Sequence, residues 1–231
     1  LMPGLFVDFE KDLQQFKLLF DKPEFRPDSL KIYPTLVIKG TKLYEMWKRG
    51  EYVPLSDEEA ADLIAKGLKY VPKYCRIIRM QRDIPSHQIV AGVKKSNLRE
   101  LVERRAEELG IRIKEIRYRE VGHKLMKGVK LNPNQIKLCR LDYEASGGRE
   151  IFLSFEDVDN DILIGFIRLR IPFKPFRKEI EGKCALIREL HVYGPLVPVG
   201  KFKKEAFQHK GFGRRLLEEA ERIAKEEFDA E

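Results

Sequence analysis

A short segment near the C-terminal end of the sequence has the residue types and spacing of a phosphate-binding loop. Gly211 and Gly213 let backbone amides approach an anion closely. The segment continues into apolar residues at helical spacing, and the first turn of a helix adds unpaired N–H groups and the positive end of its dipole. A phosphate is the expected ligand, with glycine packing at a helix start as the alternative. The segment consists of Gln208, His209, Lys210, Gly211, Phe212, Gly213, Arg214 and Arg215.

Two ionisable side chains, Glu189 and His191, precede this loop in a segment with the pattern of a strand that ends in a turn. Proton transfer in catalysis needs a general acid or base, and either residue could act as one. The alternative is that the two side chains alternate with Leu190 and merely face the opposite side of the strand. Both interpretations stay open at the level of sequence.

The net charge of +8 is concentrated in the middle of the sequence. Residues 76–127 carry 14 basic and 7 acidic side chains, whereas residues 1–75 carry 12 of each and residues 128–231 carry 19 and 18. Such an excess suits a surface that binds phosphates, because each neutralised phosphate releases counterions. A solvated basic face is the alternative. The candidate phosphate-contacting residues are Arg76, Arg79, Arg82, Lys94, Lys95 and Arg99.

The sequence favours no metal site. Its three cysteines, Cys75, Cys139 and Cys184, are widely spaced and are expected to be free thiols. The aspartates from Asp157 to Asp161 do not continue as a calcium loop, because isoleucine replaces the required glycine at the sixth position and arginine the glutamate at the twelfth. His123 and Cys139 would supply only two ligands.

Apolar periodicity and turn residues predict two domains joined by a linker. Residues 1–95 alternate helix and strand patterns, as in the last units of a partial α/β barrel, and residues 96–136 are expected to form a basic helical linker. Residues 137–231 have longer strands in a meander. The expected helices are 9–20, 41–49, 56–65 and 97–109, and the expected strands are 30–38, 75–82, 137–144, 150–156, 162–171 and 184–192.

The Gln-x-x-Gly-x-Gly loop at a helix start, after a meander, resembles the pyrophosphate loop of the GNAT acetyltransferase superfamily. The resemblance implies acetyl-CoA as cofactor and a mixed-sheet GNAT domain. It assigns the pyrophosphate to Gln208, Gly211, Phe212, Gly213, Arg214 and Arg215. It assigns the pantetheine arm to the exposed backbone of Glu189, Leu190, His191 and Val192.

Further motifs resemble the family of the Elongator catalytic subunit over essentially the whole sequence. They are residues 28–38, 81–85, 96–100, 119–122, 141–157, 188–194, 197–199 and 208–213. The resemblance makes residues 1–95 the C-terminal part of a radical S-adenosylmethionine domain. It implies acetyl-CoA-dependent modification of the wobble uridine (U34) of tRNA at carbon 5, giving a carboxymethyl-type uridine. The implied partners are tRNA, acetyl-CoA and accessory Elongator subunits, and the implied compartment is the cytoplasm, with no membrane.

The sequence departs from this family in what it lacks. No Cys-x4-Cys-x2-Cys run is present, so the [4Fe-4S] cluster and S-adenosylmethionine are expected to be bound by other parts of the intact protein. The strand and tyrosine that follow the phosphate loop in the family are also missing. We therefore expect these 231 residues alone to bind acetyl-CoA weakly or not at all and to be inactive. The alternatives are a non-catalytic tRNA-binding module and a protein lysine acetyltransferase.

Overall fold

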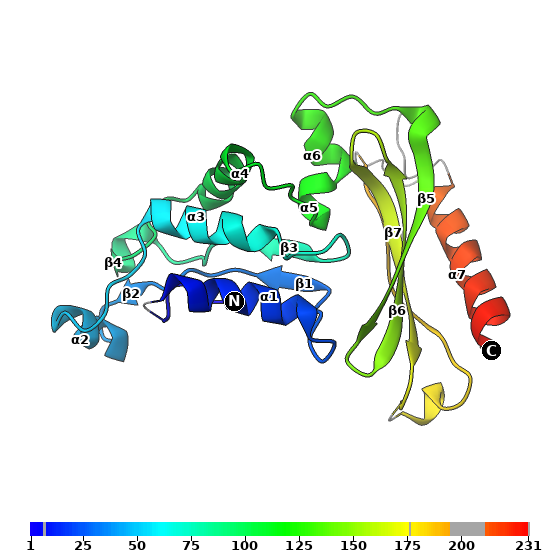
Figure 1. The fold of residues 1–231 in the computed structure, drawn as a ribbon, viewed down its shortest axis with the longest axis horizontal. Helices are drawn as coiled ribbons and strands as arrows, with labels where there is room; N and C mark the ends of the chain where they lie inside the picture. Colours follow the sequence, from blue (N-terminus) through cyan, green and yellow to red (C-terminus); the bar gives the residue numbers. More distant parts are fainter. Residues whose placement is uncertain (7, 176, 195–210, 231) are drawn as a thin grey trace. The chain divides into compact units, whose positions relative to one another are not determined.

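The computed structural model describes residues 1–6, 8–175, 177–194 and 211–230. The chain forms two compact units (Figure 1). The first contains Leu1–Lys22 and Arg26–Arg117, and the second contains Pro23–Phe25 and Tyr118–Glu231. The division between the units falls inside residues 96–136, so the part of the chain expected to be a linker contributes to both.

The helices of the first unit are α1 (Phe9–Asp21), α2 (Lys42–Lys48), α3 (Asp57–Leu68) and α4 (Leu98–Glu108). Their positions agree with the predicted ranges because their start signals are local. Ser56 and Glu59 form a reciprocal capping box at the start of α3. Asn97 precedes α4 as predicted, but its side chain donates to Glu100 Oε2 at 3.3 Å and makes no cap bond to the helix backbone.

The strands of the first unit are short. The single strand expected over residues 30–38 is split into β1 (Ser29–Lys31) and β2 (Val37–Ile38), which belong to different sheets. Between them lies Pro34, which lacks the N–H group that a continuous ladder needs. β1 pairs in parallel with β3 (Arg76–Arg79), and β2 pairs antiparallel with β4 (Ile89–Ala91).

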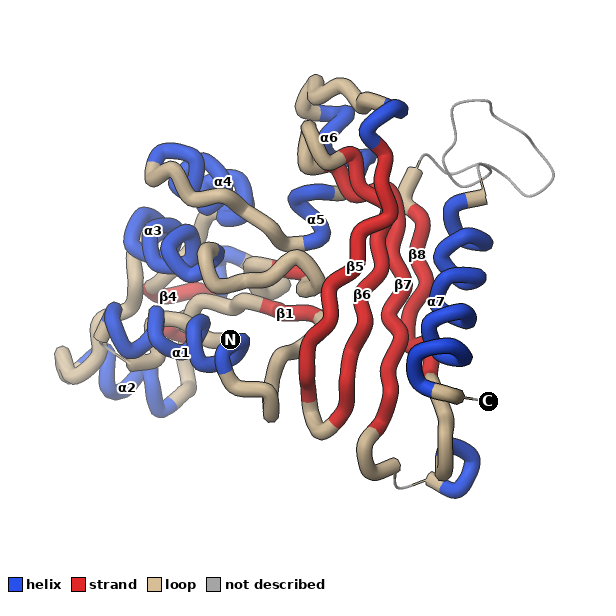
Figure 2. Tube along the Cα trace, turned by 45° about the vertical axis from the view of Figure 1, so that its right-hand side comes forward, coloured by secondary structure: helices blue, strands red, loops and turns tan. Residues whose placement is uncertain are grey.

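The second unit is built on a four-stranded antiparallel sheet in the order β5-β6-β7-β8 (Figure 2). Its strands are β5 (Ile136–Ala145), β6 (Gly148–Asp157), β7 (Ile162–Pro172) and β8 (Leu186–Val192). The predicted meander is confirmed, since each strand pairs with the next along the chain.

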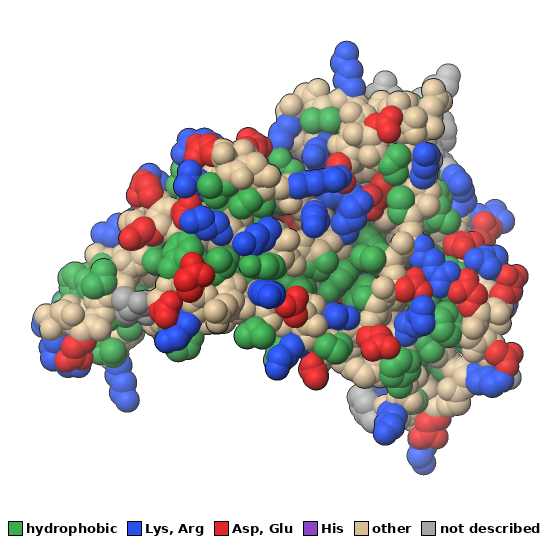
Figure 3. Space-filling view, viewed as in Figure 1, with side chains coloured by type: hydrophobic (Ala, Val, Ile, Leu, Met, Phe, Trp, Pro, Cys, Tyr) green, Lys and Arg blue, Asp and Glu red, His purple; other side chains and the backbone are tan. Residues whose placement is uncertain are grey.

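One long helix, α7 (Phe212–Phe228), packs on a face of this sheet. Its buried residues recur at helical spacing: Phe212, Leu216, Ala220 and Ile223. Over α7 the exposed basic and acidic side chains are interspersed (Figure 3), as in the pair Arg214–Glu218 at 2.7 Å.

Short elements complete the fold. They are helices α5 (Ile116–Arg119) and α6 (Val121–Met126) and the 3₁₀ turns Ser86–Gln88, Pro133–Gln135 and Lys178–Ile180. In the ranges that the structure describes, no helix has the length and apolar character needed to cross a membrane.

Candidate functional site

The start of α7 has the conformation of an anion-binding helix end. Gly211 is the N-cap residue with φ of +76°, in the left-handed region that favours glycine, and a Cβ added there would meet open space. Among the described residues, no side chain caps this end and no acidic side chain lies in the first turn. The helix dipole therefore acts on this point without a carboxylate to offset it. Three residues of the predicted loop, Gln208, His209 and Lys210, lie outside the described residues.

The first turn of α7 lies against the C-terminal end of β8. A Cβ added to Gly213 would be 3.5 Å from Cγ2 of Val192, which is ordinary van der Waals distance. Phe212 anchors the turn to the sheet, with its ring 4.9 Å from that of Phe155. The predicted loop glycines and the predicted strand are thus brought together.

The two arginines of this turn differ in their surroundings. The guanidinium of Arg215 lies 4.5 Å from the ring centre of Phe155 and is held against the sheet. Arg214 is largely exposed, with 83% of its side chain accessible, and pairs with Glu218. Arg214 is therefore the more exposed cation beside the helix end.

β8 is an edge strand among the residues that the structure describes, because it pairs with β7 alone. Its outer edge presents backbone N–H and C=O groups that can bind an extended ligand. Leu190 lies opposite Ile167 in the β7–β8 register, and the flanking residues Glu189 and His191 lie opposite Arg168 and Phe166.

The pairing shows that Glu189 and His191 share a face of the sheet. Nε of Arg168 donates to Oε2 of Glu189 at 2.8 Å. The ring of His191 lies 4.3 Å from that of Tyr193 and 6.3 Å from that of Phe166. Glu189 and His191, the two candidates for a general acid or base, therefore lie on one face of β8.

Charged residues of β6 and β7 form a network on the same face. Glu150 is buried, with 1% of its surface exposed. Its carboxylate accepts hydrogen bonds from Nη1 of Arg170 at 2.5 Å and from Nη2 of Arg188 at 2.7 Å. Sequence reasoning did not single out Arg168 or Arg170. The available signal was an arginine pair inside the otherwise apolar run of residues 162–171.

The basic residues of the first unit gather only in part. Arg79, Arg82 and Arg99 line one hollow of about 820 Å³ at the C-terminal end of β3, with Arg117, which sequence reasoning missed. Ligands of parallel α/β folds bind at this end of the strands. Arg82 also lies over the ring of Tyr33, 5.8 Å from its centre.

The guanidinium of Arg99 is largely committed to the protein itself. Its Nη2 donates to Ile77 O at 2.7 Å, its Nη1 lies 3.3 Å from Oε1 of the buried Glu115, and burial lowers the pKa of Arg99. Arg99 therefore shapes the wall of the hollow. Arg79 forms an ion pair with Asp83, but both side chains are exposed.

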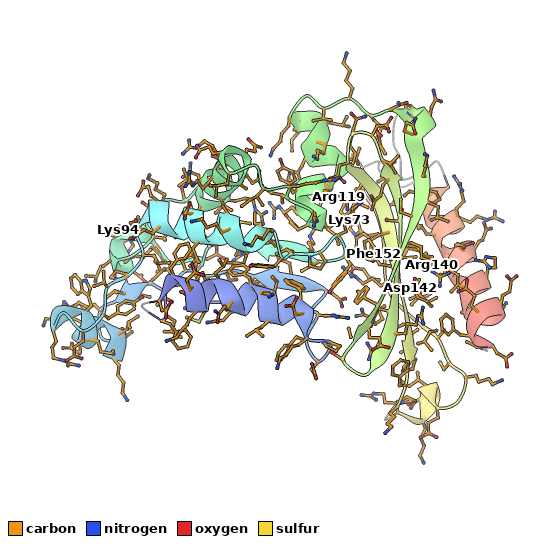
Figure 4. All side chains as sticks on the ribbon, viewed as in Figure 1. Lys73, Lys94, Arg119, Arg140, Asp142 and Phe152 are labelled. Carbon is orange, nitrogen blue, oxygen red and sulfur yellow. The ribbon has the colours of Figure 1, made fainter. Side chains whose placement is uncertain are left out.

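Lys94 and Lys95 are not among the residues that line this hollow, and neither is Arg76. Lys94 lies by the start of α3 (Figure 4), where the backbone N–H groups of Lys94 and Lys95 donate to Oδ1 of Asp57. Nζ of Lys95 also pairs with Glu58 at 3.1 Å. The predicted RNA-binding residues thus fall into separate groups.

Two family models match the chain. Residues 27–108 match the Radical SAM C-terminal domain, and residues 128–231 match the Acetyltransferase (GNAT) family. The chain is 59% identical to a tRNA uridine(34) acetyltransferase of Methanocaldococcus jannaschii over 99% of its own length. It is 50% identical to human Elongator complex protein 3 over 98% of its length. Close homologues of the chain are thus proteins named tRNA uridine(34) acetyltransferase and Elongator complex protein 3.

Similarity in structure agrees with that in sequence. The archaeal Elp3 of Methanocaldococcus infernus, solved with an N-terminal deletion, matches with a TM-score of 0.91 and 56% identity. The match covers 99% of this chain and 55% of that one. The chain spans 43% of the archaeal acetyltransferase and 42% of human Elongator complex protein 3. It therefore corresponds to a radical SAM C-terminal region followed by a GNAT domain.

Proposed function

We propose that this chain forms the acetyl-CoA-binding and tRNA-contacting part of an Elongator-type enzyme that modifies U34 of tRNA at carbon 5, giving a carboxymethyl-type uridine. The observation that carries the proposal is the juxtaposition of the glycine-led start of α7 with the end of β8, which is an edge strand among the described residues. On that strand, Glu189 and His191 share one face. These elements combine an anion site, an edge for an extended ligand and groups for proton transfer.

The residues fit acetyl-CoA in its charge and its extended shape. The backbone of Gly211, Phe212 and Gly213 would hold the pyrophosphate, with Arg214 and Arg215 beside it and Gln208 on the preceding segment. The edge of β8 from Glu189 to Val192 would hold the pantetheine arm. Acetyl-CoA supplies the acetyl group. Glu189 and His191 are the candidates to accept or donate a proton there.

The tRNA is proposed to bind the hollow of the first unit. Guanidinium groups and the neutral donors Gln81 and Ser96 line this hollow. Arg79, Arg82 and Arg117 are the proposed phosphate contacts, with Arg99 in support. Arg76, Lys94 and Lys95 are retained as contacts outside the hollow. Accessory Elongator subunits are proposed as partners, and the cytoplasm as the compartment.

The radical chemistry is assigned to parts of the intact protein other than this chain. Cys75 precedes β3, Cys139 lies in β5 and Cys184 precedes β8, so these thiols come from three separate segments. Among the residues that the structure covers, no group of three metal-ligating side chains gathers. S-adenosylmethionine and the [4Fe-4S] cluster need ligands from elsewhere in the polypeptide.

Calorimetric titration of acetyl-CoA into the full-length protein tests the cofactor site, using Gly211→Ala with Gly128→Ala as matched control. Both glycines have positive φ, +76° and +79°, and open space at the Cβ position, so both substitutions strain the backbone equally. We expect Gly211→Ala to raise Kd at least about tenfold and Gly128→Ala to leave it within about twofold. Equal Kd values for both variants and the parent protein would remove the phosphate assignment.

The salt dependence of tRNA binding tests the hollow. Replacing Arg82 and Arg117 with glutamine should weaken binding and reduce the slope of log K against log salt by about 0.7–0.9 per lost phosphate contact. Arg104→Gln is the control, because Arg104 is exposed on α4 outside the hollow. A slope unchanged by the hollow variants would contradict the assignment.

Turnover of acetyl-CoA by the full-length protein decides between the classes of function. The proposal expects turnover that depends on tRNA. Turnover stimulated by a basic peptide and indifferent to tRNA would identify a lysine acetyltransferase. Binding of tRNA with no turnover at all, in protein loaded with its cluster, would identify a non-catalytic binding module.

A further inference from the structure

The Glu189 carboxylate forms an ion pair with a buried arginine. Arg168 lies on β7 directly opposite Glu189, and its side chain is only 2% exposed. Its guanidinium lies 5.3 Å from the ring centre of Phe152 and 5.0 Å from that of Phe166. Aromatic rings attract and pack against a guanidinium group, so this cation has a restricted position.

Glu189 itself has more freedom than its partner. Its side chain is 43% exposed on a strand whose outer edge is open among the described residues, so other rotamers would place the carboxylate in solvent. The 2.8 Å contact from Nε of Arg168 therefore sets the direction of the carboxylate. It holds the group on the same face as His191, which lies two residues farther along β8.

The neighbouring charge cluster has a different role. Glu150 is buried and receives two arginines, Arg170 and Arg188. Arg170 also donates to the carbonyl oxygens of Ala145 and Ser146, at 3.0 Å and 2.8 Å, at the turn between β5 and β6. That cluster closes a hairpin and involves neither candidate acid–base group. Among the described contacts, Arg168 is the arginine that donates to the candidate Glu189.

We propose that Arg168 is a positioning residue for the reaction: it holds the Glu189 carboxylate beside His191 in the orientation that proton transfer requires. The inference rests on the proposed function, because it gives Glu189 a partner in that role. Arg168 acts through Glu189, and it touches neither substrate nor cofactor in this scheme. Removing Arg168 should lower the rate of the chemical step far more than it changes cofactor binding.

A double-mutant cycle in the full-length holoenzyme tests this coupling, with kcat and KM measured for tRNA-dependent acetyl-CoA turnover. Glu189→Gln should lower kcat by about 100-fold. Arg168→Met should lower kcat by about 10- to 100-fold, with KM for acetyl-CoA within about threefold. The double variant should be no slower than Glu189→Gln within about twofold, because effects on one unit do not add. Arg168→Lys should restore part of the loss.

Arg149→Met is the control for loss of an arginine from this sheet; the Arg149 side chain is 46% exposed, whereas that of Arg168 is 2% exposed. Arg149 also combines an ion pair, to Asp142 at 2.9 Å, with an aromatic contact, to Phe228 at 5.7 Å, but it lies away from Glu189 in the pairing of the sheet. We expect its kcat to stay within about twofold of the parent value. Crystal structures of both variants give a readout independent of activity: the Glu189 carboxylate should change its rotamer in Arg168→Met and keep it in Arg149→Met.

The outcomes separate this inference from the proposed function. Absence of tRNA-dependent turnover in the parent holoenzyme would overturn the proposed function itself. Normal parent turnover, with losses that multiply in the double variant, would overturn the positioning role of Arg168 alone. So would an unchanged kcat in Glu189→Gln, or a Glu189 rotamer that persists in Arg168→Met.

Discussion

Asp157, at the end of β6, is a fully buried carboxylate held by four hydrogen bonds. Oδ2 accepts from Asn132 N at 2.7 Å and Asn160 Nδ2 at 2.9 Å, and Oδ1 accepts from Asp159 N at 3.2 Å and Asn160 N at 3.3 Å. In Asp157→Asn, the remaining oxygen can still accept from two donors, but an amide group at the position of Oδ2 would face the donors Asn132 N and Asn160 Nδ2. A hydrogen bond to a charged group contributes about 1.5–3 kcal/mol. We expect the free energy of unfolding to fall by about 3 kcal/mol at pH 7.

The pH dependence of this loss is a second, independent test. Burial would raise the pKa of Asp157, but the hydrogen bonds from Asn132, Asn160 and Asp159 outweigh it and hold that pKa below its usual value. A carboxyl with a lowered folded-state pKa stabilises the fold above the unfolded value of about 3.9 and loses that contribution as pH falls toward the folded value. The difference between parent and variant should stay constant above about pH 5 and shrink below about pH 4.

Urea unfolding, monitored by amide hydrogen exchange in β6 and β7, measures this difference in the free energy of unfolding for the second unit. Asp159→Asn is the control, because Asp159 is exposed in the same turn, and it should change stability by less than about 0.5 kcal/mol. Equal stability of Asp157→Asn and the parent protein at pH 7 would refute the reasoning. A difference that stays constant from pH 7 to pH 3 would refute its electrostatic part.

Three further substitutions probe elements around the site. Ser56→Ala should lower the free energy of unfolding by about 1 kcal/mol, because it removes the capping box of α3. Thr41→Ala at the start of α2 should have a smaller effect on thermal unfolding, because that helix has no buried residue. Arg140→Gln should remove contacts to Asp142 and Glu227, with a loss of about 1 kcal/mol that diminishes as salt is added. Gly165→Ala should destabilise by about 1–3 kcal/mol in urea and lower kcat, since its Cβ would lie 2.8 Å from His191 O; unaltered stability would show that β8 can shift freely.

Sequence predicted the elements whose signals are local. The start of α3 follows from Ser56 and Glu59, three residues apart, and the meander follows from turn residues between long apolar strands. These features depend on neighbours along the chain, which is the information that periodicity and capping patterns contain. The positive φ of Gly211 was not predicted, because an N-cap residue usually has an extended backbone.

The rest depended on contacts between distant segments. The Arg168–Glu189 pair is set by the register of β7 on β8, and the hollow joins residues 78–85 to Ser96, Arg99 and Arg117. The charge count of residues 76–127 could not show that Arg99 turns toward buried Glu115. Composition shows how many basic side chains are present, but only the fold determines which of them form ion pairs with carboxylates of the protein itself.

The helix that begins at the proposed phosphate site, α7, contacts the sheet at both of its ends. Gly213 in its first turn lies against Val192 of β8. In its last turn, Glu227 accepts a hydrogen bond at 2.7 Å from Nη2 of Arg140 on β5. Arg140 is labelled in Figure 4. With contacts at both ends and a buried face on the sheet, the helix is not expected to tilt when a ligand binds at its first turn. We expect cofactor binding to leave the axis of α7 unchanged, so that the proposed phosphate site keeps a fixed position relative to β8.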